Sequence, residues 1–243
     1  MTPSPAGTRL GVLPPLALYV HIPWCVKKCP YCDFNSHQAR GDVPEQAYVE
    51  ALVTDLELAL PEVWGRRVTS IFFGGGTPSL FSAAAVDTLI SAFRARLSLA
   101  ADCEITLEAN PGTFEAEKFR GYREAGVNRL SIGVQSFNPR HLNALGRIHD
   151  DREARHAIEI AQDSFDNINL DLMVALPEQT RASASVCSGS ATMRSRLMLS
   201  NESWAISIAR RASRSSWIRP SAFKCFGLKL WTPIESRFTP ASR

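Results

Sequence analysis

Cys25-Val-Lys-Lys-Cys29-Pro-Tyr-Cys32 sets three cysteines in a C-x3-C-x2-C spacing, directly after the apolar run from Leu16 to Ile22. Three thiolates can hold three irons of a cubic [4Fe-4S] cluster, and the fourth iron is then left without a protein ligand. Sets of four cysteines close such a cluster for electron transfer. The stretch therefore indicates an iron–sulfur cluster with one iron open to a small molecule.

Zinc and disulfides are the alternatives for these cysteines. A C-x2-C pair alone is often a zinc half-site or a redox dithiol. The remaining cysteines, Cys103, Cys187 and Cys225, form no second pair of that spacing, so a zinc ribbon would lack its other half. Ligands packed this closely in a chain without a secretion signal fit a reducing compartment, which disfavours a disulfide framework.

The length and composition are those of a globular protein. The chain has 243 residues, of which 45% are apolar, enough for one large domain or two small ones. The apolar stretch 10–20 is interrupted by Pro14 and Pro15 and lacks a basic region before it, so it does not resemble a targeting segment. No run approaches the roughly 18 apolar residues that span a membrane. We expect a cytoplasmic protein without a transmembrane segment.

The chain changes character near Thr180. Residues 181–243 carry nine Arg, two Lys, two Glu and no Asp, a charge of +9, which leaves −6 of the total +3 for residues 1–180. The same segment holds fourteen Ser and shows no sustained helical or strand period. We therefore divide the chain into an N-terminal extension (1–15), a folded unit (16–180) and an aberrant Ser/Arg-rich tail (181–243).

Three interpretations of the tail remain open. A basic arm would bind nucleic acid, and the chain would then be a nucleic-acid-binding protein with a structural metal. A disordered tail is a second interpretation, although three Trp are unusual for it. We favour the third, out-of-frame translation after about residue 180, because the composition changes abruptly; on that interpretation no nucleic acid is expected to bind.

Residues 16–175 alternate between strand and helix patterns. We expect strands at 16–22, 68–73, 104–109, 129–133 and 167–173, and helices at 46–60, 83–97, 114–125, 140–145 and 151–163. Pro61 should stop the first helix, Ser82 and Thr113 should cap the second and third, and Gly126 should follow the third. Successive βα units predict an α/β fold with a parallel sheet, either doubly wound or curled into a barrel.

Polar or glycine residues recur where these strands end. They are His21, Cys25, Gly74 to Thr77, Glu108, Asn110, Gln135 and Asp171. Each alone is as well explained as a turn glycine or a satisfied strand-end polar group. Five successive strand ends with this pattern favour a functional site, because βα barrels place their sites at the carboxyl ends of the strands.

Seven strings of residues resemble the radical S-adenosylmethionine superfamily and, more narrowly, the oxygen-independent coproporphyrinogen III oxidase family. They are Leu18-Tyr-Val-His-Ile-Pro-Trp-Cys25, Cys29-Pro-Tyr-Cys32-Asp-Phe-Asn-Ser-His37, Phe73-Gly-Gly-Gly-Thr-Pro-Ser79, Glu108-Ala-Asn-Pro111, Ser131-Ile-Gly-Val-Gln-Ser-Phe137, Leu145-Gly-Arg147 and Asn169-Leu-Asp-Leu172. The resemblance implies a partial, three-quarter parallel (β/α) barrel, incomplete after residue 180. It covers about two-thirds of the chain.

The resemblance also implies the site residues. Cys25, Cys29 and Cys32 would ligate the [4Fe-4S] cluster. Contacts to S-adenosyl-L-methionine would come from Tyr19, Tyr31, Gly74, Gly75, Gly76, Thr77 and Glu108, and contacts to a second such molecule from Gln135, Arg147 and Asp171. Glycines let backbone groups approach a charged ligand closely. No catalytic side chain is assigned, because the cofactors carry the chemistry. Lys27 and Lys28 either hold the negative cluster or are solvated loop lysines.

Phe34 distinguishes two branches of that family. The decarboxylating enzymes carry a further cysteine at this position, whereas the string Cys32-Asp-Phe-Asn-Ser-His37 resembles a sister branch of heme chaperones. This resemblance implies heme binding, transfer to respiratory proteins, and an electron donor such as flavodoxin or ferredoxin. His21, His37, His141 and His149 are the candidate heme ligands. Coproporphyrinogen III dehydrogenation and an inactive truncated product are the alternatives, so whether the chain is an enzyme stays open.

Overall fold

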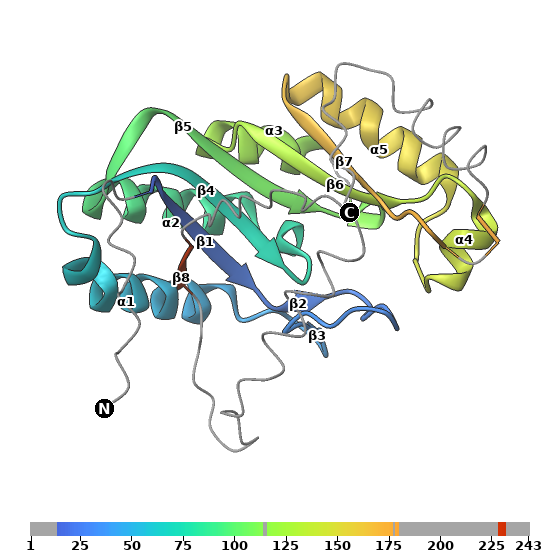
Figure 1. Cartoon of the computed structure of the whole chain (residues 1–243), viewed down its shortest axis with the longest axis horizontal. Coiled ribbons are helices and arrows are strands. Elements are labelled where there is room, and N and C mark those ends of the chain that lie inside the picture. The colour runs from blue at the N-terminus through green and yellow to red at the C-terminus, as the bar shows by residue number, and fades with distance from the viewer. Residues whose placement is uncertain (1–13, 114–115, 177, 180–227, 232–243) are drawn as a thin grey trace, which may run out of the picture.

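A computed structural model describes residues 14–113, 116–176, 178–179 and 228–231, and these build one main sheet with helices (Figure 1). Its strands are β1 (Leu16–Ile22), β4 (Arg67–Gly75), β5 (Ser98–Ala109), β6 (Arg129–Gln135), β7 (Ile168–Leu172) and β8 (Leu228–Trp231). A small second sheet joins β2 (Trp24–Cys25) to β3 (His37–Gln38). The helices are α1 (Glu45–Val63), α2 (Ala83–Arg96), α3 (Ala116–Ala125), α4 (Pro139–Ala144) and α5 (Asp151–Ser164), with 3-10 turns η1 (Pro78–Leu80) and η2 (Pro111–Thr113).

The order of the strands decides between the two α/β architectures. The main sheet runs β7-β6-β5-β4-β1-β8. Its parallel pairs are β1 with β4, β4 with β5, β5 with β6, and β6 with β7. Each crossover therefore steps in the same direction, and right-handed crossovers of that kind place every helix on one face. The longer helices pack on each other in chain order, α1 on α2, α2 on α3 and α3 on α5. The fold is a partial parallel (β/α) barrel, as expected.

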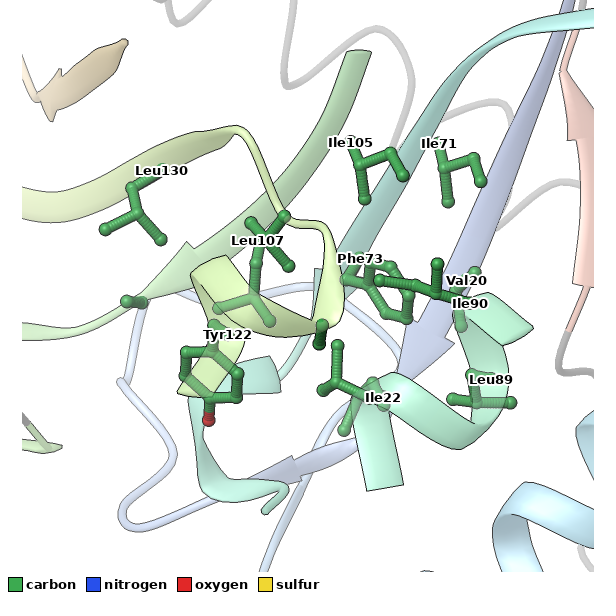
Figure 2. Close-up of a cluster of buried hydrophobic side chains, with 14 of the residues drawn as sticks. Val20, Ile22, Ile71, Phe73, Leu89, Ile90, Ile105, Leu107, Tyr122 and Leu130 are labelled. Atoms are coloured by element: carbon green, nitrogen blue, oxygen red, sulfur yellow. The ribbon is translucent and has the colours of Figure 1, made fainter. Parts of the chain in front are cut away.

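The core lies between the sheet and the helices. In β1, Leu16, Leu18, Val20 and Ile22 are buried while the alternate residues are partly exposed. Figure 2 shows Val20, Ile22 and Phe73 from two strands gathered against Leu89 and Ile90 of α2. Since successive side chains of a strand point to opposite faces, the alternate residues line the face that carries no helix.

Most of the expected elements form close to the expected bounds. The first strand is confirmed at Leu16–Ile22, and Ser82 caps α2 by accepting a hydrogen bond of 3.1 Å from the Ala85 N–H. Gly126 follows α3 with φ of 109°, a backbone conformation that glycine adopts without strain. A capping box of Asp150 and Glu153, which the sequence interpretation missed, begins α5.

Pro61 does not stop α1, which continues to Val63. Proline removes one backbone hydrogen bond and crowds the preceding turn. Only two helical residues follow Pro61, so the lost bond falls in the last turn, where helix ends fray in any case. The stop expected at this residue is therefore wrong by three positions, and Trp64 forms the cap.

Some expectations fall outside the described residues. Residues 1–13 of the N-terminal extension, the side chain of Thr113, residues 114–115 and most of the segment 181–243 are among them. Four residues of that last segment form β8, which pairs antiparallel with Ala17–Val20 of β1 and was not predicted. No helix in the described part of the chain has the length and apolar character needed to cross a bilayer.

We expect Tyr122→Phe to destabilise the fold. The buried Tyr122 hydroxyl lies between two backbone carbonyls and donates to Ser79 at 3.1 Å and to Phe81, which fastens α3 to the turn after the glycine loop. Loss of this buried hydrogen-bond donor should lower the free energy of unfolding, measured in urea, by about 1–3 kcal/mol. The exposed Thr88→Ala should change it by less than about 0.5 kcal/mol, and an equally small effect of Tyr122→Phe would contradict the assignment.

Candidate functional site

The three cysteines lie on a loop whose two ends are hydrogen-bonded to each other. Trp24 and Cys25 of β2 pair in parallel with His37 and Gln38 of β3. The His37 N–H donates to Pro23 at 2.7 Å, and the Ala39 N–H donates to Cys25 at 2.9 Å. The loop is thus closed at its base before any ligand is considered. The sequence interpretation missed both short strands, since two residues carry no period.

The sulfurs share buried hydroxyl groups. Cys25 is buried, whereas Cys29 and Cys32 are partly exposed, and all three are free thiols. Ser36 is buried with its Oγ at 3.7 Å from the Cys32 Sγ, and it also hydrogen-bonds to Cys25, as does Thr77. Burial raises the pKa of the Cys25 thiol, and the two hydroxyls oppose that rise. Hydroxyl donors stabilise negative sulfur, as a thiolate ligand requires.

A single metal ion has no ready site among the described residues. No group of three His, Cys, Asp or Glu side chains there is arranged to hold one ion. A cubic cluster makes a different demand, because each thiolate binds its own iron. Three thiols on one closed loop can supply one ligand to each of three irons.

Lys28 is exposed, as one of the two alternatives expected, and its ammonium group also contacts the backbone of the cysteine loop. Its Nζ donates to the backbone carbonyls of Phe34 at 3.2 Å and Ser36 at 2.8 Å. It therefore bridges the two arms of the cysteine loop. These hydrogen bonds give Lys28 a structural contact that the sequence interpretation missed.

The glycine loop is bound to the base of the cysteine loop. The Gly76 N–H donates to Ile22 and the Thr77 N–H to Trp24, each at 2.7 Å. A Cβ on Gly76 would lie 2.5 Å from the Trp24 carbonyl oxygen, a contact that backbone cannot relieve. At Gly75 a φ of 122° adds a conformation that side chains avoid. These glycines are required by the close approach of two backbones.

Arg147 joins the cysteine loop to the ends of β5 and β6. Its Nη1 lies 3.6 Å from the Cys29 Sγ, and its Nη2 donates to the Asn110 Oδ1 and, at 2.8 Å, to the Gly133 carbonyl. The Asn110 amide donates in turn to the Thr77 Oγ1 at 3.0 Å. The Arg147 Nε is buried and has no hydrogen-bond partner among the residues that the structure describes.

Two carboxylates lie on the face without helices. The Glu108 Oε2 accepts from the Gly75 N–H at 3.2 Å. Burial, followed by the charge of Asp171, raises the pKa of Glu108 to about 8. Burial also raises the pKa of Asp171, although hydrogen bonds from Ser131 and Asn169 oppose that rise.

The other expected residues lie at the same edge of the sheet. The Tyr19 hydroxyl is 3.0 Å from the His21 Nδ1, and its ring stacks on Phe72. Gln135 ends β6 with a left-handed φ of 64°, and its amide nitrogen is near Gly133. Tyr31 projects from the cysteine loop and interacts electrostatically with Arg147 and Cys29. All the expected site residues therefore lie at the cysteine loop, at the glycine loop or on the face of the sheet without helices, which is called the open face below.

The four candidate histidines have different surroundings. Both ring nitrogens of His21 have partners, Tyr19 and the Asn35 carbonyl. His149 is buried with its Nε2 at 3.1 Å from the Val134 carbonyl oxygen, and burial lowers its pKa. His141 lies 3.5 Å from the Ser136 Oγ, and His37 is exposed. None of these contacts singles out a heme ligand.

The sequence interpretation assigned no role to Ser36, Ser131 or Asn169. All three are buried polar side chains that contact an expected site residue. The alternation of Asn169 and Asp171 along one strand face was the available signal, since residues two apart in a strand share a face.

Comparison with known proteins agrees with the geometry. Residues 19–185 match the family model described as the radical SAM superfamily. The chain is 57% identical over 169 residues to the heme chaperone HemW of Escherichia coli K12, covering 69% of this chain and 45% of that protein. It is 53% identical over 173 residues to the heme chaperone HemW of Haemophilus influenzae, with the same two coverages of 69% and 45%.

A solved structure has a similar fold. Coproporphyrinogen III oxidase (HemN) from Escherichia coli, described as a radical SAM enzyme, superposes with a TM-score of 0.67 and 31% identity. The match covers 82% of this chain and 47% of that one. The chain spans less than half the length of the curated relatives named above.

The two adjacent lysines of the cysteine loop provide a matched test. Lys28→Met removes the donor to Phe34 and Ser36, so amide hydrogen exchange across residues 29–36 should accelerate about tenfold or more. Lys27→Met removes the same charge from an exposed side chain and should leave exchange unchanged. Equal effects of the two variants would show that charge, and not the carbonyl bridge, orders the loop.

Proposed function

The chain belongs to the radical SAM superfamily, in its HemW branch, and we propose that it binds heme as a radical S-adenosylmethionine protein and passes it to respiratory proteins. The observation that carries the proposal is the closed cysteine loop, with three free thiols, bonded to a glycine loop at the carboxyl edge of the sheet. The identity to heme chaperones over the same residues supports the branch. Because less than half of those relatives is matched, the activity of the whole protein is part of the proposal.

Three features of the chain fit a cluster and S-adenosylmethionine. The three free thiols lie on one closed loop, the buried Arg147 Nε has no hydrogen-bond partner among the described residues, and the glycine loop is hydrogen-bonded to the base of the cysteine loop. Cys25, Cys29 and Cys32 would hold the cluster, and the residues from Gly74 to Thr77 would hold the methionine end of S-adenosylmethionine. When bound, the two groups together supply one-electron reductive cleavage chemistry.

The surrounding side chains would orient the ligand. The guanidinium of Arg147 is held in place and suits the carboxylate of the ligand. The Glu108 and Asp171 carboxylates suit a cationic group of the ligand. Tyr19 and Tyr31 offer aromatic surface, and Gln135 offers an amide at the edge of the open face. Each of these roles is inferred from position and chemistry.

Heme handling is favoured over porphyrinogen oxidation by one residue of the cysteine loop. Phe34 stands where the decarboxylating enzymes carry an additional cysteine, and its side chain is 65% exposed on the loop. An exposed phenyl ring gives an apolar contact for a flat ligand but no sulfur chemistry. The similarity to coproporphyrinogen III oxidase supports the alternative, oxidative decarboxylation of coproporphyrinogen III.

The proposal extends to the electron donor and the compartment. Reduction of the cluster needs a low-potential one-electron donor, for which flavodoxin or ferredoxin is suited. Free thiols fit a reducing compartment, and we place the protein in the cytoplasm on that ground.

Anaerobic reconstitution of the full chain with iron and sulfide tests the cluster site. The wild type should take up about four irons and show thiolate-to-iron absorbance. Cys25→Ala should lose most of that iron, because the open cluster has no spare cysteine ligand. Cys103→Ala, a buried cysteine of β5, is the matched control and should retain it. Equal iron in the two variants would refute the assignment.

Heme titration of the reconstituted chain separates the two functions. We expect saturable, stoichiometric heme binding seen in the Soret band, and no protoporphyrinogen when coproporphyrinogen III, S-adenosylmethionine and a reductant are supplied. Heme binding without turnover supports the chaperone function. Turnover without heme binding would instead establish the oxidative decarboxylation.

A further inference from the structure

A row of polar side chains crosses three strands on the face without helices. Glu108 of β5 is in register with Ser131 of β6, and Ser131 is in register with Asn169 of β7. Register partners of parallel strands share a face, and so does Asp171, two residues beyond Asn169. These four residues are called the carboxylate row below. Ser131 and Asn169 have no role in the function proposed so far.

Ser131 and Asn169 hold both oxygens of the Asp171 carboxylate. The Ser131 hydroxyl donates to Oδ2 at 2.9 Å, and the Asn169 amide donates to Oδ1 at 2.8 Å. The same amide also donates to the Ser131 Oγ at 3.0 Å, which closes a triangle of hydrogen bonds. Both supporting side chains are only 4% exposed, so this geometry is enforced by packing.

One acceptor in the row is unused. The Asn169 Oδ1 is buried and has no hydrogen-bond partner in the part of the chain that the structure describes. A buried amide oxygen without a donor is costly unless a ligand or water supplies one. The free acceptor beside two carboxylates therefore points to a ligand group that carries N–H or O–H donors.

The charges around the row do not neutralise both carboxylates. The negative charge of Asp171 on β7 raises the pKa of Glu108, and the charge of Glu108 in turn raises the pKa of Tyr19 on β1. The positive charge of Arg129 on β6 lowers the pKa of Asp171. The Arg129 Nη1, however, lies 3.6 Å from Glu104 and 3.3 Å from Thr106, so its charge is shared. Two facing carboxylates in a buried site retain a proton more readily than either would alone.

We propose that Ser131 and Asn169 are positioning residues that hold Asp171 toward Glu108, so that the carboxylate pair receives a cationic ligand group in exchange for a proton. The inference rests on the proposed binding of S-adenosylmethionine, whose ammonium and sulfonium groups are the cations available. The proton leaves to solvent, and the charge that the pair gains is balanced by the ligand. Below about pH 8, where Glu108 retains its proton, the exchange opposes binding, and above that pH Glu108 is already ionised.

Calorimetry of S-adenosylmethionine binding to the reconstituted full chain measures the exchanged proton. Titrations in two buffers of different ionisation enthalpy should show release of up to about one proton near pH 7, falling toward zero above pH 9. The amino group of the ligand can release a proton of its own. Glu108→Gln keeps the shape and removes the carboxylate, so the wild type should release more protons than this variant, and equal release overturns the proposal.

Ser131→Ala tests the positioning role while keeping both carboxylates. Loss of a donor to Asp171 should favour its protonated form, so affinity at pH 7 should fall about tenfold and recover toward the wild-type value at pH 9. Asn169→Ala should behave in the same way and serves if Ser131→Ala does not fold by circular dichroism. Ser91→Ala, an exposed serine of α2, is the matched control and should not change affinity at either pH.

The outcomes separate the two levels of the proposal. A wild type that takes up no cluster or binds no S-adenosylmethionine refutes the proposed function and this inference with it. A wild type that binds with no more proton release than Glu108→Gln leaves the function standing and overturns the exchange. An affinity loss in Ser131→Ala and Asn169→Ala that is equal at pH 7 and pH 9 shows a merely structural role and overturns the positioning claim.

Discussion

The contact between two backbones at Gly76 is the constraint on which the site depends. The parallel pairing of β1 with β4 brings the cysteine loop and the glycine loop to the same edge, where two hydrogen bonds of 2.7 Å join them. The approach is so close that any side chain at Gly76 would overlap the Trp24 backbone. Because the hydrogen bonds fix the glycine loop against the base of the cysteine loop, the positions of the thiols follow from sheet register. A shift of the register between β1 and β4 by one residue would separate the cysteine loop from the glycine loop.

The same alternation that builds the core also builds the open face. In β1, every second side chain is buried against the helices, and its neighbour faces away from them. Barrels with a filled interior place bulky apolar residues on that second face. Here the second face of β5, β6 and β7 carries Glu108, Ser131 and Asp171, which give up apolar packing inside the barrel. The apolar core therefore lies on the helix side, and polar side chains occupy the other face of these strands.

The parts of the fold that follow from periodicity were predictable from the sequence. β1 and the cap at Ser82 formed as expected because a buried period of two and a serine before a helix have direct local causes. The paired strands β2 and β3, the bridge made by Lys28 and the partners of Asp171 were not predictable. Each depends on groups brought together by the fold, for which a single sequence has no period. Pro61 failed as a stop signal for a related reason, since its cost depends on how much helix follows.

Arg147 and the carboxylate row give the site a positively charged end and a negatively charged end. The guanidinium lies between Cys29 and the ends of β5 and β6, whereas Glu108 and Asp171 lie on the open face below those ends. A ligand with one anionic and one cationic group gains from both only in one orientation, because reversing it would place like charges together in a partly buried site. The opposite charges would therefore select orientation as well as affinity. That selection needs no movement of the protein, since both groups are already fixed by hydrogen bonds to backbone or buried side chains.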